Sequence, residues 1–338
     1  MGIVTDSDIT SYLATLNIIP TTLSQLNGGT ANLAWRIRDS TNRSIIIKHA
    51  EPYIRTNASI LLPTDRMDFE HVALTTLTLP PQPHIDIPIA LPSVYHYNST
   101  RHVLLMSDGG PRTMKAAYTD PTLDIPALGR GLGTWLASLH ASTKTTTSVG
   151  DNQTAKSIAR YSYANLASAL ASYGFDASLG EDIDAEYGSL LQSDDACICH
   201  GDFWPGNIVL AAASTSRPTA TVVDWELVRR GCGATDVGQF AAEAYLLDRF
   251  CGSRGLCAAF LDAYALAAEE KGALGREWWG RCGVHLGTHL AFWPTSVVWG
   301  GREETGECVG LGRELLLRAR GGGRGWRELL VLPIKPAG

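Results

Sequence analysis

Asp202 and Asn207 are the residues of this sequence whose types and spacing best suit chemistry on a hydroxyl group. They lie five positions apart in HGDFWPGN (200–207), a stretch with two glycines and a proline that we expect to form a loop. A carboxylate in such a loop can orient a hydroxyl group and accept its proton, and an amide oxygen can hold Mg²⁺. Because phosphoryl transfer needs both functions, we predict that Asp202 is a catalytic base and Asn207 a metal ligand.

A second acidic motif, VVDWELV (222–228), follows on a predicted strand. Asp224 and Glu226 are two positions apart, so on an extended strand both carboxylates would project from one face. Two like charges side by side on an apolar strand favour a hard divalent cation between them. Seventeen positions separate Asn207 from Asp224, enough for a hairpin, so we expect Asn207, Asp224 and Glu226 to share Mg²⁺. Either motif alone would also fit a solvated loop aspartate or an acidic pair on an edge strand.

The first part of the chain contains residues suited to binding phosphate groups. Residues 27–32 form a turn of small residues between predicted strands, and the backbone amides around Gly28, Gly29 and Asn32 could cover nucleotide phosphates. Lys48 ends the β-branched run SIIIK, from which it could reach the phosphates and pair with Glu70 on the next predicted helix. The plain alternatives are an ordinary glycine hairpin and a lysine at the edge of a sheet.

The elements that must position these residues change in type along the chain. Strand signals dominate the first third, in 21–50, 93–98 and 101–107, with one predicted helix in 63–79. Helical patterns dominate afterwards, in 127–142, 153–174, 235–250, 254–270 and 284–299, and the strands of 197–212 and 219–228 interrupt them. The glycine-rich stretch 319–328 is expected to be a loop. We predict an α+β fold of two lobes, with a nucleotide-binding lobe at 1–107 and a larger helical lobe for catalysis and acceptor binding at 108–338.

The overall composition argues against several classes of partner. The chain has 338 residues, a formal net charge of −6 and no dense Lys/Arg cluster, so we expect no nucleic acid partner. It contains no apolar run of about 18 residues and begins without a secretory signal, so we predict no membrane span and a cytoplasmic protein.

The cysteines offer an alternative metal site. The seven cysteines are an odd, scattered set, which favours reduced thiols over a disulfide framework. Cys197, Cys199 and His200 have the side chains of a zinc site, but the C-x-C spacing lacks a second pair of ligands. Because the two cysteines alternate with Ile198, as buried strand residues do, we favour buried thiols.

Several of these motifs resemble those of a known superfamily. HGDFWPGN and DWE are similar to the motifs of the aminoglycoside phosphotransferase and choline kinase superfamily, which has the protein-kinase-like fold. GGTANLAWRI, IIIKHAEPYIR and DRMDFEHVAL look like segments of 5-methylthioribose kinases. DWELVRRGCGATDVGQF and VVWGGREE resemble segments of the fungal 4-hydroxytryptamine kinases, which are closer still. The resemblance spans roughly residues 24–305 and is more specific for phosphoryl transfer than for the acceptor.

The resemblance implies an ATP-dependent and Mg²⁺-dependent kinase that phosphorylates a hydroxyl group of a small metabolite. It implies that Lys48 contacts the phosphates, that Glu70 is its partner, and that Asp236 braces the catalytic loop from behind. It also places the connection between the lobes, with Met106 and Asp108, beside the adenine ring. The roles that it implies for Asp202, Asn207, Asp224 and Glu226 are those predicted above.

The acceptor is expected in the late helical segment HLGTHLAFWPTSVVW (285–299). Its aromatic side chains and the acidic residues that follow suit a hydroxylated aromatic amine. The candidates are Trp293, Trp299, His285, His289, Glu303, Glu304 and Glu307. A plain apolar core followed by a solvated acidic turn would look the same.

Three other functions remain open from the sequence. A 5-methylthioribose-type sugar kinase is one, although this segment lacks the Arg-Arg pair that grips the sugar in that family. A non-catalytic nucleotide-binding protein is another. The third, a kinase for protein substrates, is disfavoured because Asp236 follows Asp224 by only twelve positions, which leaves little platform for a polypeptide.

Overall fold

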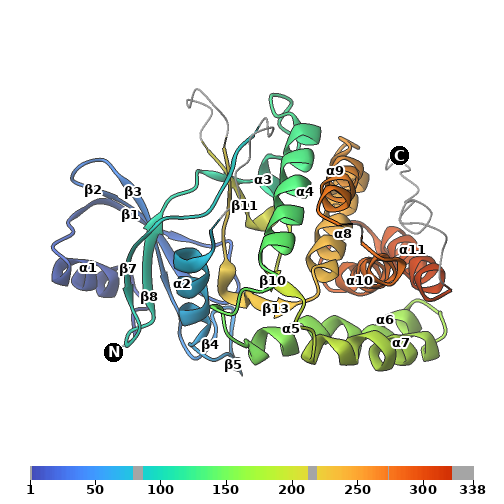
Figure 1. Ribbon diagram of the computed structural model, residues 1–338. Helices are drawn as coiled ribbons and strands as arrows, with labels where there is room; N and C mark the ends of the chain where they lie inside the picture. The colour runs from blue at the N-terminus through green and yellow to red at the C-terminus, as the bar shows by residue number, and fades with distance from the viewer. Residues whose placement is uncertain (1, 79–86, 212–218, 273, 322–338) are drawn as a thin grey trace.

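The computed structural model describes residues 2–78, 87–211, 219–272 and 274–321. Its N-terminal part is built on a five-stranded antiparallel sheet, and its C-terminal part is mainly helical (Figure 1). The order of strands across the sheet is β1 (Pro20–Leu26), β2 (Leu33–Asp39), β3 (Ser44–His49), β8 (Val103–Ser107) and β7 (Val94–Asn98).

Apolar residues alternate along the central strands and determine which face each helix covers. Trp35 and Ile37 of β2 and Ile47 of β3 are fully buried, and they form a core with helix α1 (Asp6–Thr15). Helix α1 begins with a capping box, in which the Thr5 hydroxyl accepts the backbone N–H of Asp8 and the Asp8 carboxylate accepts that of Thr5.

The opposite face of the sheet carries Lys48 and faces helix α2 (Arg66–Thr76). Met67 of this helix packs against Leu104 and Met106 of β8. The short hairpin β4 (Tyr53–Ile54) and β5 (Asn57–Leu61) precedes α2. Helix α2 therefore holds its polar residues over the end of β3, where the phosphate-binding side chains were expected.

Small strands lie between the sheet and the helices. A four-stranded sheet has the order β6 (Ile89–Ala90), β12 (Ala220–Val222), β11 (Ile208–Leu210) and β9 (Arg112–Thr113), and β10 (Cys197–Cys199) pairs with β13 (Arg229–Gly231). Strands β11 and β12 are antiparallel, with Ile208 opposite Val222. This hairpin returns the chain from Asn207 to Asp224, as the sequence predicted.

The larger part consists of helices α3 (Met114–Ala117), α4 (Ile125–Ser142), α5 (Gln153–Ala164), α6 (Leu166–Ser172), α7 (Ser178–Ile183), α8 (Ala234–Phe250), α9 (Leu256–Glu270), α10 (Arg276–Phe292) and α11 (Arg302–Arg320). Short helical turns are η1 (Asp184–Gly188), η2 (Ser189–Gln192), η3 (Pro205–Asn207), η4 (Trp225–Leu227) and η5 (Trp293–Thr295). Helices α4 and α9 pack closely because Gly133 has no side chain: a Cβ there would lie 2.4 Å from the carbonyl oxygen of Phe260.

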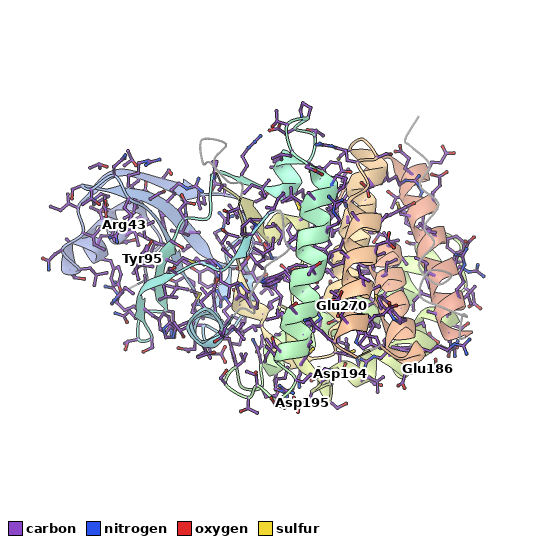
Figure 2. All side chains as sticks on the ribbon, turned by 45° about the horizontal axis from the view of Figure 1, so that its top comes forward. Arg43, Tyr95, Glu186, Asp194, Asp195 and Glu270 are labelled. Atoms are coloured by element: carbon purple, nitrogen blue, oxygen red, sulfur yellow. The ribbon has the colours of Figure 1, made fainter. Side chains whose placement is uncertain are left out.

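The two parts also differ in their exposed side chains (Figure 2). On the sheet, the Arg43 guanidinium lies 4.9 Å from the centre of the Tyr95 ring. On the helical part, Glu186, Asp194 and Asp195 lie low in this view and Glu270 lies higher. Glu186, Asp195 and Glu270 are exposed, whereas Asp194 is partly buried in an ion pair with Arg281. Within the described parts of the chain, every helix is too short or too polar to cross a lipid bilayer.

The predicted α+β class is confirmed, with a smaller β-rich part and a larger helical part. Some predicted elements have different limits. The helix expected at 153–174 is divided at Asn165 into α5 and α6, and the one expected at 284–299 ends at Phe292, before the proline-containing turn η5. The expected glycine-rich loop lies largely beyond residue 321, outside the described residues.

Candidate active site

The loop that carries Asp202 is held from behind by Asp236 at the start of α8. The two oxygens of the Asp236 carboxylate accept the backbone N–H groups of His200 at 2.7 Å and Gly201 at 3.0 Å. Gly201 has a φ of +90°, and a Cβ there would lie 2.0 Å from the carbonyl oxygen of Leu227. A glycine is therefore required at this turn, and the loop leaves it in a fixed direction.

Asp202 and Asn207 are in direct contact. The Asn207 amide nitrogen donates to the Asp202 carboxylate at 3.0 Å and to the Asp202 backbone carbonyl at 2.9 Å. The other carboxylate oxygen of Asp202 accepts a hydrogen bond from Gln239 of α8 at 2.6 Å. Burial and the nearby charge of Asp224 raise the pKa of Asp202 to about 6, although the two amide donors lower it. A carboxylate with this pKa is a stronger base than an ordinary aspartate and is still ionised at neutral pH.

Lys48 joins the sheet to the second acidic motif. Its ammonium group donates to both oxygens of Glu70 on α2, at 2.8 and 2.9 Å, and to Asp224 at 2.5 Å. Burial alone would lower the pKa of Lys48, but the charges of Asp224 and Glu70 outweigh it and raise the pKa above its usual range. The lysine is therefore charged, and its contact with Asp224 links two segments 176 positions apart.

The predicted strand geometry of Asp224 and Glu226 was wrong. Strand β12 ends at Val222, Asp224 has left-handed backbone angles (φ 68°, ψ 60°), and Glu226 belongs to the turn η4. The alternation of a strand therefore does not position these two carboxylates. Left-handed backbone angles are uncommon for residues other than glycine. At Asp224 they occur together with the hydrogen bond from Lys48.

Glu226 and Asn32 form a buried network with Arg66 of α2. Asn32 donates to Glu226 Oε2 at 2.7 Å, Arg66 lies 3.1 Å from the same oxygen, and Arg66 also donates to the Asn32 side-chain oxygen at 2.9 Å. Burial and the charge of Asp224 raise the pKa of Glu226 to about 8. Asn32 thus holds the Glu226 side chain, a contact that the sequence did not suggest. Both contacts use Oε2 of Glu226, and among the described residues its Oε1 has no partner.

The other predicted nucleotide-binding residues differ in their surroundings. Gly28 and Gly29 lie exposed in the turn between β1 and β2, where nothing crowds the position of a Cβ on Gly28. The Met106 side chain is buried in the core beneath α2. The Asp108 carboxylate is occupied by Arg36 at 2.7 Å and by the Ser44 hydroxyl at 2.6 Å. Because these contacts use the Asp108 carboxylate, only the backbone of Asp108 remains to contact a nucleotide.

The predicted acceptor residues are spread over several surroundings. His289 Nε2 donates to the Glu243 carboxylate of α8 at 2.9 Å, and its ring centre lies 6.1 Å from that of Trp293. His285 is instead hydrogen-bonded to Tyr163 at 3.0 Å. Burial lowers the pKa of His285 to about 3, so it is neutral.

The acidic residues of α11 do not converge on the catalytic loop. Glu304 accepts the backbone N–H of Gly301 and so caps the helix, Glu307 is paired with Arg249, and Glu303 is exposed. Trp299 instead packs against Phe250 at the end of α8, with 6.1 Å between the ring centres.

Gln239 and Glu243 are the site residues that sequence reasoning missed. They are polar residues four positions apart in the middle of helix α8, so they share one of its faces. That spacing in DVGQFAAEAY was the available signal.

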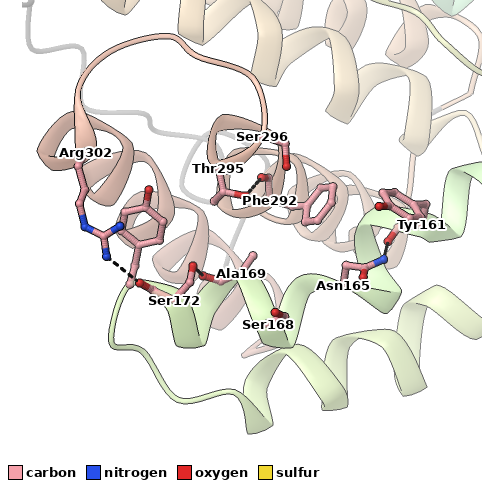
Figure 3. A pocket seen from close by; sticks show the side chains of 10 residues that line it. Tyr161, Asn165, Ser168, Ala169, Ser172, Phe292, Thr295, Ser296 and Arg302 are labelled. Carbon is pink, nitrogen blue, oxygen red and sulfur yellow. Dashed lines mark hydrogen bonds between the residues drawn. The ribbon is translucent and has the colours of Figure 1, made fainter. Parts of the chain in front are cut away.

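A separate cavity lies among α5, α6, the end of α10 and the start of α11 (Figure 3). Its volume is about 350 Å³. It is lined by Tyr161, Asn165, Ser168, Ala169, Ser172, Tyr173, Phe292, Thr295, Ser296 and Arg302. The Arg302 guanidinium lies 5.0 Å from the centre of the Tyr173 ring and donates to the Ser172 carbonyl. Because this cavity has no carboxylate in its lining, it lacks the base and the cation ligands of the site at Asp202.

The two cysteines of β10 are buried, as predicted, and all seven cysteines are free thiols. Cys197 and Cys199 lie with His140 of α4 in a group whose candidate donor atoms are within 4.8 Å of one another. His200 is not part of this group, since its ring contacts the Val223 carbonyl at 3.0 Å. His140 already uses both ring nitrogens, at 2.9 Å to Tyr264 and 3.3 Å to Asp236, so the group supports the loop-bracing aspartate.

Comparison with known proteins agrees with this geometry. Residues 22–278 match the profile of the family described as "Phosphotransferase enzyme family" (APH). The chain belongs to this phosphotransferase family. Membership makes it a phosphotransferase and confirms the small-molecule kinase class predicted from HGDFWPGN and DWE.

Two curated relatives of this phosphotransferase span nearly its whole length. It is 26% identical to the 4-hydroxytryptamine kinase of Psilocybe cyanescens over 98% of both chains. It is 24% identical to the 4-hydroxytryptamine kinase of Psilocybe cubensis, over 94% of this chain and 93% of the relative.

Solved structures share the fold at low sequence identity, which confirms the predicted protein-kinase-like architecture. An amicoumacin kinase in complex with AMP-PNP, Ca²⁺ and Ami has a TM-score of 0.53 and 11% identity, covering 92% of this chain and 93% of its own. The macrolide 2'-phosphotransferase MphH from Brachybacterium faecium has a TM-score of 0.50 and 16% identity, covering 92% and 97%.

The contacts of Asp236 lead to a prediction about stability. Burial alone would raise its pKa, but hydrogen bonding and charge from His140, with Arg229, lower it to about 2. A lowered carboxylate pKa contributes stability that is present above the ordinary pKa near 4 and is lost as the pH falls towards the folded value. We expect Asp236→Asn to lower the free energy of unfolding at pH 7 by about 2 kcal/mol, the worth of this shift.

Urea unfolding of both proteins between pH 7 and pH 3 checks this expectation. The difference between wild type and Asp236→Asn should narrow below about pH 4. Asp195→Asn is the matched control, because Asp195 is a surface residue paired with Arg230 and such pairs contribute little. Equal stability of Asp236→Asn and wild type at pH 7 would show that the bracing contacts contribute nothing.

Proposed function

We propose that this phosphotransferase transfers the γ-phosphate of ATP, in the presence of Mg²⁺, to the hydroxyl group of a small hydroxylated aromatic amine. The observation that carries the proposal is the position of the Asp202 carboxylate. It is held by Asn207 and Gln239 and is close enough to Asp224 for the charge of that residue to raise its pKa. A base, a lysine and a cation-binding carboxylate thus belong to one site.

The residues present fit a magnesium ion. The Asn207 hydrogen bonds to Asp202 use its amide nitrogen, which leaves the amide oxygen, a ligand that Mg²⁺ accepts. The Lys48 contact uses Asp224 Oδ1, and the contacts of Glu226 use Oε2, so each carboxylate retains an oxygen. Asn207, Asp224 and Glu226 would hold the ion, which supplies positive charge to the phosphate oxygens.

The side chains of the chain itself have distinct roles in this proposal. Asp202 orients the acceptor hydroxyl and takes its proton as the new O–P bond forms and the bond from the γ-phosphorus to the bridging oxygen of ADP breaks. Lys48, fixed by Glu70, contributes positive charge to the phosphates. The backbone amides at Gly28 and Gly29 would cover them, and residues 1–107 would bind the nucleotide while 108–338 bind the acceptor. The shared fold with a kinase solved with AMP-PNP supports a nucleotide as donor.

The acceptor class rests on the two relatives and on the aromatic residues near the catalytic loop. Both relatives are named 4-hydroxytryptamine kinases. Trp204 lies in the loop itself, and the Lys115 ammonium lies 4.8 Å from its ring and 4.4 Å from the ring of Trp299. Flat aromatic surfaces in and near the catalytic loop suit an aromatic acceptor better than a sugar.

We expect the purified protein to phosphorylate 4-hydroxytryptamine in preference to 5-methylthioribose. With both acceptors at equal concentration and limiting enzyme, the ratio of products measures the ratio of kcat/KM values. The aromatic amine should be favoured at least about 100-fold, because a site that pairs buried polar groups with one substrate rejects an analogue lacking them. Asp202→Ala provides the blank. Preferential phosphorylation of 5-methylthioribose would show that the protein is a sugar kinase and would contradict the proposal.

A further inference from the structure

Glu243 has a buried carboxylate oxygen that forms no hydrogen bond with any described residue. The residue lies in the middle of α8 and is only 9% exposed. Its Oε1 is 2.9 Å from His289 Nε2, but its Oε2 has no hydrogen-bond partner in the described part of the chain. Burying a carboxylate is costly unless its oxygens are paired. Oε2 is therefore an acceptor that lacks a donor.

The position of Glu243 relates it to the catalytic base. Gln239, one helical turn earlier on the same face of α8, donates to Asp202 at 2.6 Å. The charge of Glu243 also contributes to the raised pKa of Asp202, so the two carboxylates are close enough to repel each other. At 1.5 Å per residue, Glu243 lies about 6 Å further along the helix axis than the residue that contacts Asp202.

Aromatic side chains lie beyond Glu243, towards the C-terminal end of α8. Phe250 follows it by seven positions, and so returns to the same face of α8, and it packs against Trp299 with ring centres 6.1 Å apart. The Lys115 ammonium lies between Trp299 and Trp204 of the catalytic loop, within 5 Å of both ring centres. The unpaired carboxylate oxygen thus lies on a helix that contacts the base one turn earlier, through Gln239, and meets Trp299 through Phe250 at its end.

We propose that Glu243 Oε2 binds the ammonium group of the acceptor while the acceptor hydroxyl lies at Asp202. This inference rests on the proposed function and names the residue that recognises the charge of its substrate. An ammonium ion supplies both the missing donor and the opposite charge. The rise of about 6 Å along α8 from Gln239, which contacts Asp202, to Glu243 is comparable with the length of a hydroxylated ring carrying an aminoethyl side chain.

The single unpaired oxygen of Glu243 also determines which ammonium groups can bind. His289 occupies Oε1, so the ammonium group needs to offer only one N–H. Primary, secondary and tertiary ammonium ions all have one, whereas a quaternary ammonium ion has none. The site should therefore accept N-methylated amines up to the tertiary stage and discriminate against the quaternary ion.

Four acceptors separate these contributions in the wild-type enzyme: 4-hydroxytryptamine, its N,N-dimethyl and N,N,N-trimethyl derivatives, and 4-hydroxyindole, which has no amine. We expect kcat/KM values within about threefold for the first two. The values for the trimethyl compound and for 4-hydroxyindole should be about 10- to 100-fold lower, the usual worth of a hydrogen bond to a charged group.

Glu243→Gln tests the residue itself. We expect it to lower kcat/KM for 4-hydroxytryptamine about 10- to 100-fold more than kcat/KM for 4-hydroxyindole, which has no ammonium group. The neutral acceptor reports whether the variant is folded and catalytically intact, and a melting temperature gives a second check. Glu270→Gln is the matched control, because Glu270 is exposed at the end of α9 (Figure 2).

The outcomes separate this inference from the function on which it rests. If the wild type phosphorylates hydroxyindoles but Glu243→Gln affects charged and neutral acceptors equally, Glu243 has only a structural role and the inference is wrong. Equal use of 4-hydroxytryptamine and 4-hydroxyindole by the wild type would also overturn it, with no variant needed. If the wild type phosphorylates none of the four, the proposed function fails first.

Discussion

Asp202→Ala is expected to lower kcat by roughly 10²- to 10⁴-fold, the usual contribution of a positioned general base. The carboxylate contacts Asn207 and Gln239, and its pKa of about 6 makes it a better proton acceptor than a solvated aspartate. Because none of its described contacts is with Lys48 or Glu70, the affinity for ATP should change little. Steady-state kinetics with an aromatic amine acceptor and a nucleotide titration measure the two quantities.

The Asp202 prediction has a sharp control in Gln239→Ala. That change removes one hydrogen bond to the carboxylate but leaves the base in place, so its effect on kcat should be much smaller. A fall in kcat for Gln239→Ala that equals the fall for Asp202→Ala would mean that positioning, not proton transfer, determines the rate. If Asp202→Ala retains the wild-type kcat, Asp202 is not the catalytic base.

Asp224→Asn is expected to abolish the dependence of ATP affinity on Mg²⁺. The change removes the negative charge that faces Lys48 and that we assign to the metal ion. In the wild type, Mg²⁺ should tighten ATP binding by at least about tenfold, a coupling of 1.4 kcal/mol. Titrating ATP with and without Mg²⁺ in both proteins measures this coupling.

Glu70→Gln is the matched control for Asp224→Asn, since each variant removes one carboxylate partner of Lys48. Glu70→Gln should weaken ATP binding while the effect of Mg²⁺ persists. If Mg²⁺ tightens ATP binding to Asp224→Asn as strongly as in the wild type, the ion is bound elsewhere.

The catalytic part of the site could be predicted from the sequence because its geometry is local. Asp202 and Asn207 are five positions apart in one loop, and Gly201 has the backbone angle that only a glycine adopts easily. Lys48 and Glu70 lie on a strand and on the helix that follows it, so their contact could also be expected from the order of elements.

Contacts between distant segments could not be predicted in this way. The backbone of Asp224 is left-handed although an alternating apolar pattern surrounds it, and strand periodicity gave the wrong geometry. Glu226 meets Arg66 across 160 positions, and Asn32 joins them, which no local spacing reveals. The unpaired oxygen of Glu243 is likewise a property of the packed helices and not of the sequence around it.

Helices α1 and α11 were not predicted from the sequence, because their apolar patterns are weak. Helix α1 begins with a capping box at Thr5 and Asp8 that can be recognised in the sequence, but its apolar face is short. Helix α11 is rich in charged residues and glycine, so only its packing against α10 reveals its buried face. Leu315 and Leu316 are fully buried there.

The most direct test of the central claim is to identify the product of the wild-type enzyme by ³¹P NMR. The protein is incubated with ATP, Mg²⁺ and 4-hydroxytryptamine, and the spectrum is followed as ATP is consumed. We predict that ADP and a phosphate monoester on the ring hydroxyl appear in equal amounts, and that Asp202→Ala forms neither at a comparable rate. Formation of inorganic phosphate alone, with the hydroxyl group unmodified, would contradict it.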